Sequence, residues 1–184
     1  MPYAVTLRLD PVGARAVEVL WKAIDASGIA RSVSMLGYDP HITLARQSDL
    51  DPLQTADLLD QFAAGLASID VEITTFGVFE QPTPVVWLAP AESAALRALH
   101  TSLRSLFLSA PWHPHTEPAQ WQPHVSLATE IADQRTFERL QSFVAERFDP
   151  FACRLDRLEL VRFPPVHVLE SIPLEGAFVA ARAH

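Results

Sequence analysis

Cysteine is nearly absent from this chain of 184 residues, which contains only Cys153. One cysteine cannot form a disulfide within the chain, so we exclude a small disulfide-stapled scaffold and expect a reducing compartment. Cys153 lies in an alternating run from Phe151 to Leu160, which predicts a buried packing residue rather than a nucleophile. With 49% hydrophobic and 20% charged residues, the chain can build a substantial apolar core without cross-links.

Positive charge is also scarce. Lys22 is the only lysine, and 14 basic residues stand against 22 acidic ones, which gives a formal net charge of -8 and a pI of about 5.3. Tight, sequence-independent binding to long nucleic acid requires a basic face, and the arginines here are scattered along the chain. We therefore expect no long nucleic acid partner, while a small anionic substrate that is bound locally stays compatible with this composition.

Long apolar runs are missing as well. No run approaches the length that a membrane-spanning helix needs. Arg8 and Asp10 interrupt the apolar positions near the N-terminus, so this segment does not resemble a signal peptide. These features predict a cytoplasmic protein with no membrane partner.

What the sequence does contain is a regular succession of strand and helix patterns. Alternating apolar and polar residues predict strands, and apolar residues at three- and four-residue steps predict helices. We expect strands at 3–9, 41–45, 71–79, 85–88, 124–129, 151–163 and 166–174, and helices at 12–26, 51–69, 93–108 and 133–148. Pro-containing turns at 81–84 and 164–165 imply antiparallel hairpins, so the predicted class is α+β. No linker separates these elements, and we expect one domain over residues 1–184.

Two stretches of eight residues carry nearly the same pattern. Tyr38–Ala45 and Trp121–Ala128 both read aromatic, polar, Pro, His, β-branched aliphatic, hydroxyl, Leu, Ala, and the second begins 83 residues after the first. Side chains alternate between the two faces of a strand. The histidine and the hydroxyl of each copy therefore share one face, while the aliphatic residues point into the core.

The repeat extends beyond these eight residues into the order of the elements. Each copy is followed by a helix, a long strand, a Pro-containing turn and another strand. An internal duplication, folded as two similar lobes, is the simplest account. Packing alone would preserve the aliphatic residues, but it gives no reason to keep a histidine beside a hydroxyl on the opposite face. The paired motif therefore indicates a function.

The two copies offer the groups that opening of a cyclic phosphate needs. Attack by water requires a base and the leaving alkoxide requires an acid, and an imidazole with a pKa near 6.5 serves as either at neutral pH. The hydroxyls of Thr43 and Ser126 can donate to the non-bridging phosphate oxygens, which gain charge in the transition state. Neither tetrad places a carboxylate beside its histidine, so we expect no metal and no other cofactor.

The tetrads His41-Ile42-Thr43-Leu44 and His124-Val125-Ser126-Leu127 resemble the signature of the two-histidine phosphoesterases. That superfamily includes the LigT-like 2'-5' RNA ligases and cyclic nucleotide phosphodiesterases. The run Leu158–Phe163 is also similar to the start of the family's closing hairpin. Ser126 departs from the threonine that the family often has, and the segment before His41 is short, which leaves the region for substrate specificity undefined.

The resemblance implies a bilobal α+β fold, with two pseudo-twofold-related lobes of antiparallel sheet and flanking helices around a central cleft. It implies that His41 and His124 are the general acid and base, and that Thr43 and Ser126 bind the substrate phosphate. It also implies a small cyclic nucleotide, or an RNA terminus with a cyclic phosphate, as the partner. The enzyme would hydrolyse, or reversibly ligate, a 2',3'-cyclic phosphate or 2'-5' phosphodiester.

Four further side chains are candidates for substrate binding. Tyr38 and Trp121 stand three residues before the two histidines and can stack on a base or ribose, although we favour a core or interface role for both. Arg162 and Arg8 lie on predicted strands and can bind phosphate, or they are solvated or paired with carboxylates.

Two alternatives to a phosphoesterase stay open at this point. One is a non-catalytic nucleotide- or RNA-binding module on the same scaffold. The other is a zinc hydrolase that uses His113 and His115 with His124, with Glu117 nearby, although we favour a plain loop for residues 110–123. The sequence does not define the physiological substrate, the choice between hydrolysis and ligation, the acid and base among the histidines, or the oligomeric state.

Overall fold

The computed structural model describes residues 2–48, 50–80, 84–107 and 112–174. The strands are β1 Tyr3–Leu9, β2 His41–Gln47, β3 Ile69–Phe79, β4 Val85–Pro90, β5 Val125–Ala128, β6 Phe151–Arg162 and β7 His167–Pro173. The helices are α1 Pro11–Ser27, α2 Pro52–Ala63, α3 Ala94–Leu106 and α4 Gln134–Ala145, with short 3-10 helices η1 Val33–Leu36 and η2 Pro114–Thr116.

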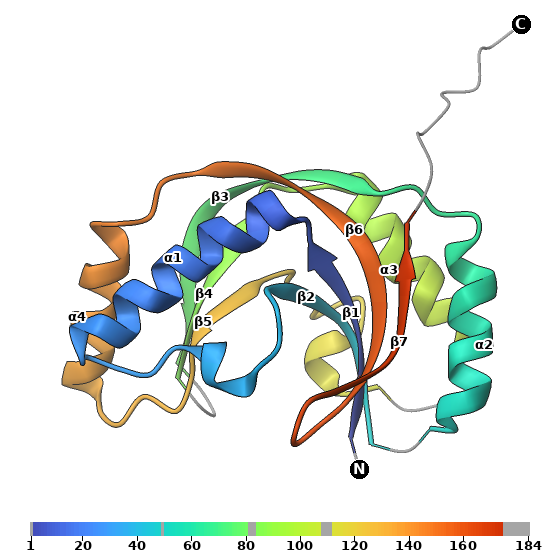
Figure 1. Ribbon diagram of the computed structural model, residues 1–184, viewed down its shortest axis with the longest axis horizontal. Coiled ribbons are helices and arrows are strands. Elements are labelled where there is room, and N and C mark those ends of the chain that lie inside the picture. The colour runs from blue at the N-terminus through green and yellow to red at the C-terminus, as the bar shows by residue number, and fades with distance from the viewer. Residues whose placement is uncertain (1, 49, 81–83, 108–111, 175–184) are drawn as a thin grey trace, which may run out of the picture.

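All seven strands form one antiparallel sheet. The order is β2-β1-β6-β3-β4-β5, and β7 pairs with β6. The long strand β6 connects the two halves, because its first residues pair with β3 and its later residues pair with β1 and β7. The sheet bends into an arch (Figure 1), so β2 and β5, which are the ends of the strand order, contact each other.

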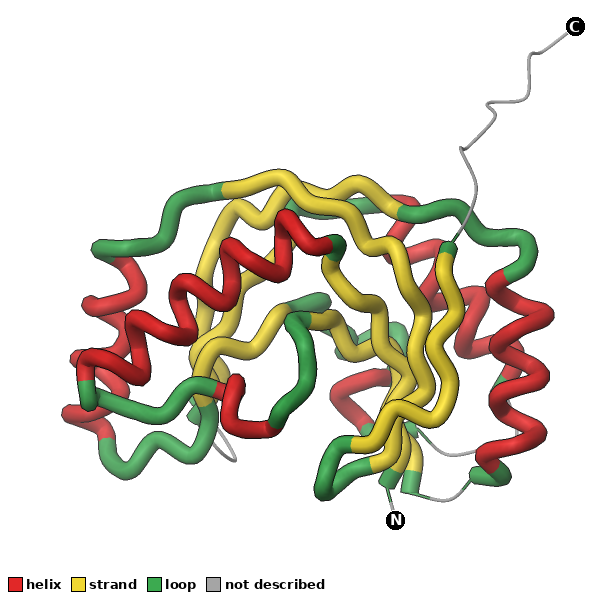
Figure 2. The backbone as a smooth tube through the Cα atoms, in the orientation of Figure 1, coloured by secondary structure: helices red, strands yellow, loops and turns green. Residues whose placement is uncertain are grey.

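The helices flank the two limbs of the arch. Figures 1 and 2 show α1 and α4 beside β3, β4 and β5, and α2 and α3 beside the strands of the other limb. Side-chain oxygens of Asp10, Asp51, Ser93 and Asp133 accept backbone N–H groups in the first turns of α1, α2, α3 and α4, respectively. Such N-caps satisfy donors that have no partner within the helix, so the helices begin where the sequence supplies Asp or Ser.

Helix α1 packs tightly on β6 at a single glycine. A Cβ atom at Gly13 would collide with the side chain of Cys153, so a larger residue would push α1 off the strand. Cys153 is buried and makes no disulfide, and burial raises the pKa of its thiol to about 12. These facts confirm Cys153 as a packing residue. The core around it is continuous and joins α1 to both limbs of the sheet.

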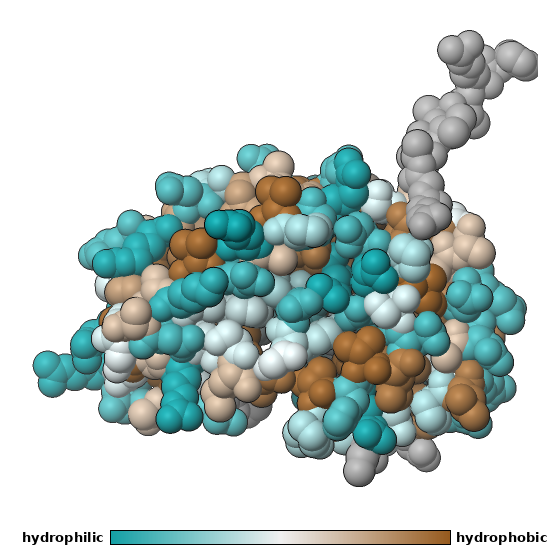
Figure 3. All heavy atoms as spheres, in the orientation of Figure 1, coloured by the Kyte–Doolittle hydropathy of each residue, from teal (hydrophilic) through white to brown (hydrophobic). Residues whose placement is uncertain are grey.

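The surface in the orientation of Figure 3 is largely hydrophilic, with apolar atoms gathered below β1 and β7. Val168 and Leu169 of β7 are among the large apolar side chains that stay exposed. Within the described residues, no helix combines the length and the apolar character that crossing a membrane requires.

The predicted α+β class, the antiparallel sheet and the order of the elements are confirmed. The predicted helix 51–69 is wrong at its end: α2 stops at Ala63, and Ile69 instead begins β3, where it pairs with Leu155. Helices α3 and α4 are likewise shorter than predicted, and His124 lies just before β5. Residues 81–83 of the predicted turn, and residues 108, 110 and 111, lie outside the described residues. The pseudo-twofold lobes and the cleft between them stay predictions.

Candidate functional site

The two histidines of the repeated motif are held in the same way. Nδ1 of His41 lies 2.8 Å from the carbonyl oxygen of Asp39, and Nδ1 of His124 lies 2.8 Å from that of Gln122. A carbonyl oxygen only accepts hydrogen bonds, so Nδ1 of each neutral ring must carry the proton. Nε2 of each neutral ring is therefore unprotonated. It can accept a proton and, once the ring is protonated, can deliver one.

The charge of His124 acts on His41. Burial is the main cause that lowers the pKa of His41 to about 4; the charges of His124 and Arg8 also lower it, while the Asp39 carbonyl and Glu159 raise it. Burial also lowers the pKa of His124, and His115 adds to the shift. Both imidazoles are therefore neutral at pH 7 in the free protein, and a bound anion would favour protonation of one of them.

The two hydroxyls share a face with the histidines. Thr43 is the register partner of Thr6 on β1, and Ser126 is the partner of Trp87 on β4. Both hydroxyl residues are half-buried. Neither side-chain oxygen bonds to another residue within the described part of the chain, which leaves both hydroxyls free to donate to a ligand. His41 and Thr43 lie on β2, Ser126 lies on β5 and His124 lies directly before β5, and these two strands contact each other.

Two tryptophans fix the strands that carry these residues. The indole N–H of Trp121 donates to the carbonyl oxygen of Thr43 at 2.9 Å, and that of Trp21, on α1, donates to the carbonyl oxygen of Ser126 at 3.1 Å. Because β2 and β5 end the sheet, their outer carbonyl groups have no neighbouring strand. Each tryptophan satisfies one of these groups.

Replacing either of these tryptophans with phenylalanine should destabilise the protein by more than the same change at Trp112. Trp112 is equally buried, but its indole nitrogen makes no hydrogen bond. Trp21→Phe and Trp121→Phe leave a strand carbonyl unpaired, which adds about 1–3 kcal/mol to the loss. Urea unfolding measures the three free energies. Equal losses in all three variants would contradict the anchoring role.

The surroundings of His41 are polar. The ring of Tyr38 lies 4.5 Å from that of His41 between centroids, and its hydroxyl bonds to Glu159 on β6. Arg8 of β1 forms ion pairs with Asp39 and Glu159. Burial raises the pKa of the Tyr38 hydroxyl, so this phenol stays protonated and acts as a donor.

The surroundings of His124 are aromatic instead. The ring of Phe79, at the end of β3, meets His124 edge to face at 5.1 Å between centroids, and Trp87 of β4 lies 5.9 Å from it. The Trp87 ring lies over Gly77, where a Cβ atom would collide with it. Glycine therefore makes room for the indole. The ring neighbours of His124 are aromatic, whereas the neighbours of His41 include charged groups.

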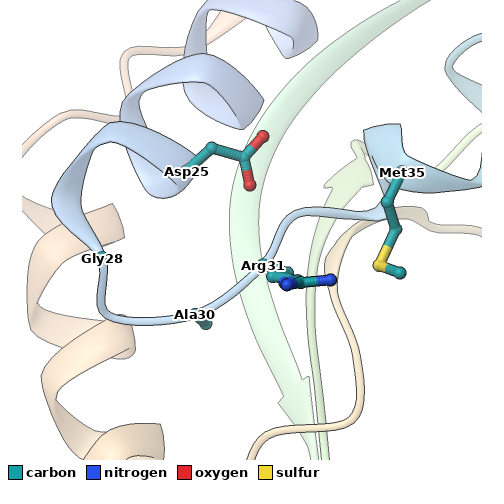
Figure 4. A pocket seen from close by; sticks show the side chains of 5 residues that line it. All are labelled: Asp25, Gly28, Ala30, Arg31 and Met35. Atoms are coloured by element: carbon teal, nitrogen blue, oxygen red, sulfur yellow. The ribbon is translucent and has the colours of Figure 1, made fainter.

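A cavity of about 610 Å³ adjoins the polar half. Arg8 and Asp39 line it, together with Arg157 and Ser171 from β6 and β7 and Arg15 of α1. A second cavity, of about 580 Å³, lies between the end of α1 and η1 (Figure 4). Asp25, Arg31 and Met35 point toward this second space, and none of the four motif residues lines it.

The structure divides the four other candidate residues that the sequence suggested into two pairs. Tyr38 and Arg8 lie beside His41. Trp121 is 5% exposed and stacks on the His100 ring at 3.8 Å, so the core role that we favoured over substrate binding fits its position. Arg162 pairs with Tyr3 and Glu159 with Thr6 in a regular register. Three steps along a strand place Arg162 on the face opposite Glu159, which favours the solvated or paired alternative for this arginine.

His113 and His115 lie side by side before β5. The two rings lie 5.2 Å apart between centroids, and the backbone N–H of His113 bonds to Arg46 of β2. Among the residues that the structure describes, no group of three His, Cys, Asp or Glu side chains is placed to hold a metal ion. The zinc alternative therefore has no ligand set within that part of the chain.

Sequence reasoning missed Glu159, Phe79, Trp87 and Trp21. Glu159 carried a signal, because an acidic residue within Leu158–Val161 interrupts an apolar strand and must find partners when buried. Phe79, Trp87 and Trp21 carried none, because aromatic residues in strands and amphipathic helices are ordinary core residues.

Residues 14–164 match the model of a family described as the 2'-5' RNA ligase superfamily. The chain belongs to the 2'-5' RNA ligase superfamily. Its members are the two-histidine phosphoesterases that the tetrads resemble. No curated protein matches the chain in a sequence search.

Several solved structures have a similar fold. E. coli LigT complexed with 3'-AMP is 17% identical, with a TM-score of 0.65 and coverage of 96% of this chain and 100% of that one. TT0787 of Thermus thermophilus is 19% identical, with a TM-score of 0.61 and coverage of 96% and 99%. Kluyveromyces marxianus Usb1 with uridine monophosphate is 15% identical, with a TM-score of 0.51 and coverage of 94% and 98%. At these identities the likeness shows a shared fold.

Proposed function

We propose that this 2'-5' RNA ligase superfamily member is a metal-independent phosphoesterase that opens a small 2',3'-cyclic phosphate, on a nucleotide or an RNA end. The observation that carries the proposal is the pair of histidines, each held with Nε2 free and each beside a free hydroxyl. That LigT and Usb1 have been solved with 3'-AMP and uridine monophosphate supports a small nucleotide as the ligand.

The proposed reaction uses the two histidines in opposite protonation states. A neutral Nε2 takes a proton from water as the water oxygen bonds to phosphorus. The bond from phosphorus to the 3'-oxygen breaks, and the protonated Nε2 of the other ring delivers its proton to that leaving oxygen. The products are a 2'-phosphate and a 3'-hydroxyl. The same steps in the same direction, with a 5'-hydroxyl in place of water as the attacking group, give a 2'-5' phosphodiester and a free 3'-hydroxyl.

The hydroxyls and the aromatic half of the site complete this scheme. Thr43 and Ser126 donate to the two non-bridging oxygens, one from each end of the sheet, and stabilise the charge that grows there. Phe79, half-buried beside His124, provides a ring on which a base can stack, and the buried Trp87 packs behind it. Tyr38 and Arg8 stand on the other side of the phosphate, beside His41.

Hydrolysis of 2',3'-cyclic nucleotides in the presence of EDTA tests the proposal. We expect turnover to a 2'-phosphate that chelation does not reduce. Saturable nucleotide binding without turnover would favour the non-catalytic binding module. Activity that requires added zinc would contradict the metal-independent scheme.

The lowered histidine pKa values predict an acidic profile for kcat/KM. This quantity reports the free enzyme, in which one histidine must be protonated although burial lowers both pKa values. The basic limb of the kcat/KM profile should therefore have its midpoint below pH 6.5, the pKa of an ordinary histidine, and kcat/KM should decline above it. In the complex, the phosphate charge favours the imidazolium and raises that pKa, so the limb of kcat should lie at higher pH. Coincident limbs would contradict this account.

A further inference from the structure

A buried carboxylate with no part in the steps above lies close to His41. Glu159 stands in the middle of β6 and is 1% exposed, and its neighbours Leu158 and Leu160 are fully buried on the other face. A buried carboxylate is costly unless it is paired and hydrogen-bonded. The partners of Glu159 therefore indicate what it holds in place.

Three donors satisfy the carboxylate, one from each neighbouring segment. Oε1 accepts from Ser171 of β7 at 2.6 Å and from Nη1 of Arg8, on β1, at 3.3 Å. Oε2 accepts from the Tyr38 hydroxyl at 2.7 Å. Arg157 approaches the same group through Ser171, to which it donates at 3.3 Å.

Two of these donors lead directly to His41. Tyr38 places its ring 4.5 Å from the His41 ring between centroids, with the planes tilted by 45°. Nη2 of Arg8 pairs with the side chain of Asp39, and the carbonyl oxygen of Asp39 accepts the Nδ1 proton of His41. Glu159 thus holds Tyr38 directly and Asp39 through Arg8, and these two adjacent residues contact the ring and the Nδ1 of His41.

The other histidine has no such support. Its carbonyl partner belongs to Gln122, and its ring neighbours are Phe79 and Trp87. Within the described residues, no carboxylate is hydrogen-bonded to a side chain that packs on the His124 ring. The two halves of the site repeat the same motif, yet in the described part of the chain only the half with His41 is tied to a buried acidic group.

We propose that Glu159 is a positioning residue, which holds Tyr38 and, through Arg8, Asp39, and so keeps His41 with Nδ1 protonated and Nε2 directed at the substrate. The kinetic consequence of this role rests on the proposed function, but the structural consequence does not. The charged and titratable groups around His41 are Arg8 from β1, Glu159 from β6, Asp39 and Tyr38 from the segment before β2, and His124 from the opposite end of the sheet.

The variant Glu159→Gln tests the role with little change in shape. It should lower kcat at least about tenfold, because a misplaced catalytic group is costly, while KM changes less than about threefold. It should also move one limb of the pH profile to lower pH, because a carboxylate favours the imidazolium and its loss lowers the pKa of His41. Movement of the acid limb identifies His41 as the base, and movement of the basic limb identifies it as the acid.

Two further variants separate positioning from a general loss of stability. Glu170→Gln removes one charge from β7, and Glu170 is the register partner of Leu160, on the face opposite Glu159. It should leave kcat and the pH profile unchanged. Tyr38→Phe keeps the ring and removes one of the bonds to Glu159, and it should lower kcat by less than Glu159→Gln. An unmoved pH profile in Glu159→Gln, or equal effects of Glu159→Gln and Glu170→Gln, would overturn the proposal.

A measurement that needs no turnover keeps this proposal distinct from the proposed function. Nitrogen-15 NMR of the histidine rings reports the tautomer directly, and His41→Ala assigns the His41 signals. In the wild type, His41 should carry its proton on Nδ1, and in Glu159→Gln it should exchange between tautomers while His124 keeps its own. An unchanged His41 tautomer would overturn the proposal even if the protein hydrolyses cyclic nucleotides, and a changed one supports it even if no turnover is found.

Discussion

His41→Ala and His124→Ala should each lower kcat for a 2',3'-cyclic nucleotide by about 10³-fold or more. One variant loses the proton acceptor for the attacking water and the other loses the donor for the leaving oxygen, and general acid–base groups contribute about 10²–10⁴-fold each. The double variant should be little worse than either single one, because the two groups act as a unit. Steady-state kinetics with all three variants measures this pattern.

His167→Ala is the matched control for these variants. His167 is exposed, lies at the start of β7 and is the register partner of Arg162, so its loss should leave kcat unchanged. Thermal unfolding should show that the His41 and His124 variants stay folded at the assay temperature. Substantial hydrolysis by either variant would refute the paired mechanism, since one remaining histidine cannot serve both ends of the reaction in the same step.

Loss of either motif hydroxyl should have the next largest effect. Thr43→Val keeps the shape of the side chain and removes its hydroxyl, and Ser126→Ala does the same at β5. Removal of one preorganised donor to a developing oxyanion costs about 10²–10³-fold in kcat. The fall should appear in kcat more than in KM, because the charge on the phosphate oxygens grows toward the transition state.

Two substitutions give the hydroxyl prediction its controls. Thr43→Ser keeps the donor and should retain most of the activity, since Ser126 already serves the other half of the site. Thr101→Val removes an exposed hydroxyl from α3 and should have no effect. Activity in Thr43→Val that equals activity in Thr43→Ser would show that this hydroxyl does not contact the transition state.

The sequence predicted those parts of the fold and site that follow local rules. Alternation along a strand predicts that His41 shares a face with Thr43 and His124 with Ser126, and the strands that carry these pairs, β2 and β5, contact each other. The same rule could not decide the role of Arg162. Alternation puts Arg162 on the same face of β6 as Leu158 and Leu160, but the sequence does not tell which face of β6 is turned toward the histidines. Knowledge of the register would have decided between the alternatives for that residue.

The rest of the site depends on contacts between distant segments. Glu159 meets Tyr38, 121 positions away, and Trp21 meets Ser126, 105 positions away, and no periodicity in a single sequence encodes such pairs. The end of α2 was missed for a similar reason, because the helical pattern continues past Ala63 while pairing of Ile69 with Leu155 draws the chain into β3. Tertiary pairing therefore decided the points at which local propensity was ambiguous.

The central claim is that one phosphate is held between the two copies of the motif. A crystal structure with a bound 2'-nucleoside monophosphate tests it most directly. The account predicts phosphate oxygens within hydrogen-bond distance of Nε2 of both His41 and His124 and of both motif hydroxyls. A phosphate that contacts the residues of only one copy, with the other histidine out of reach, would contradict it.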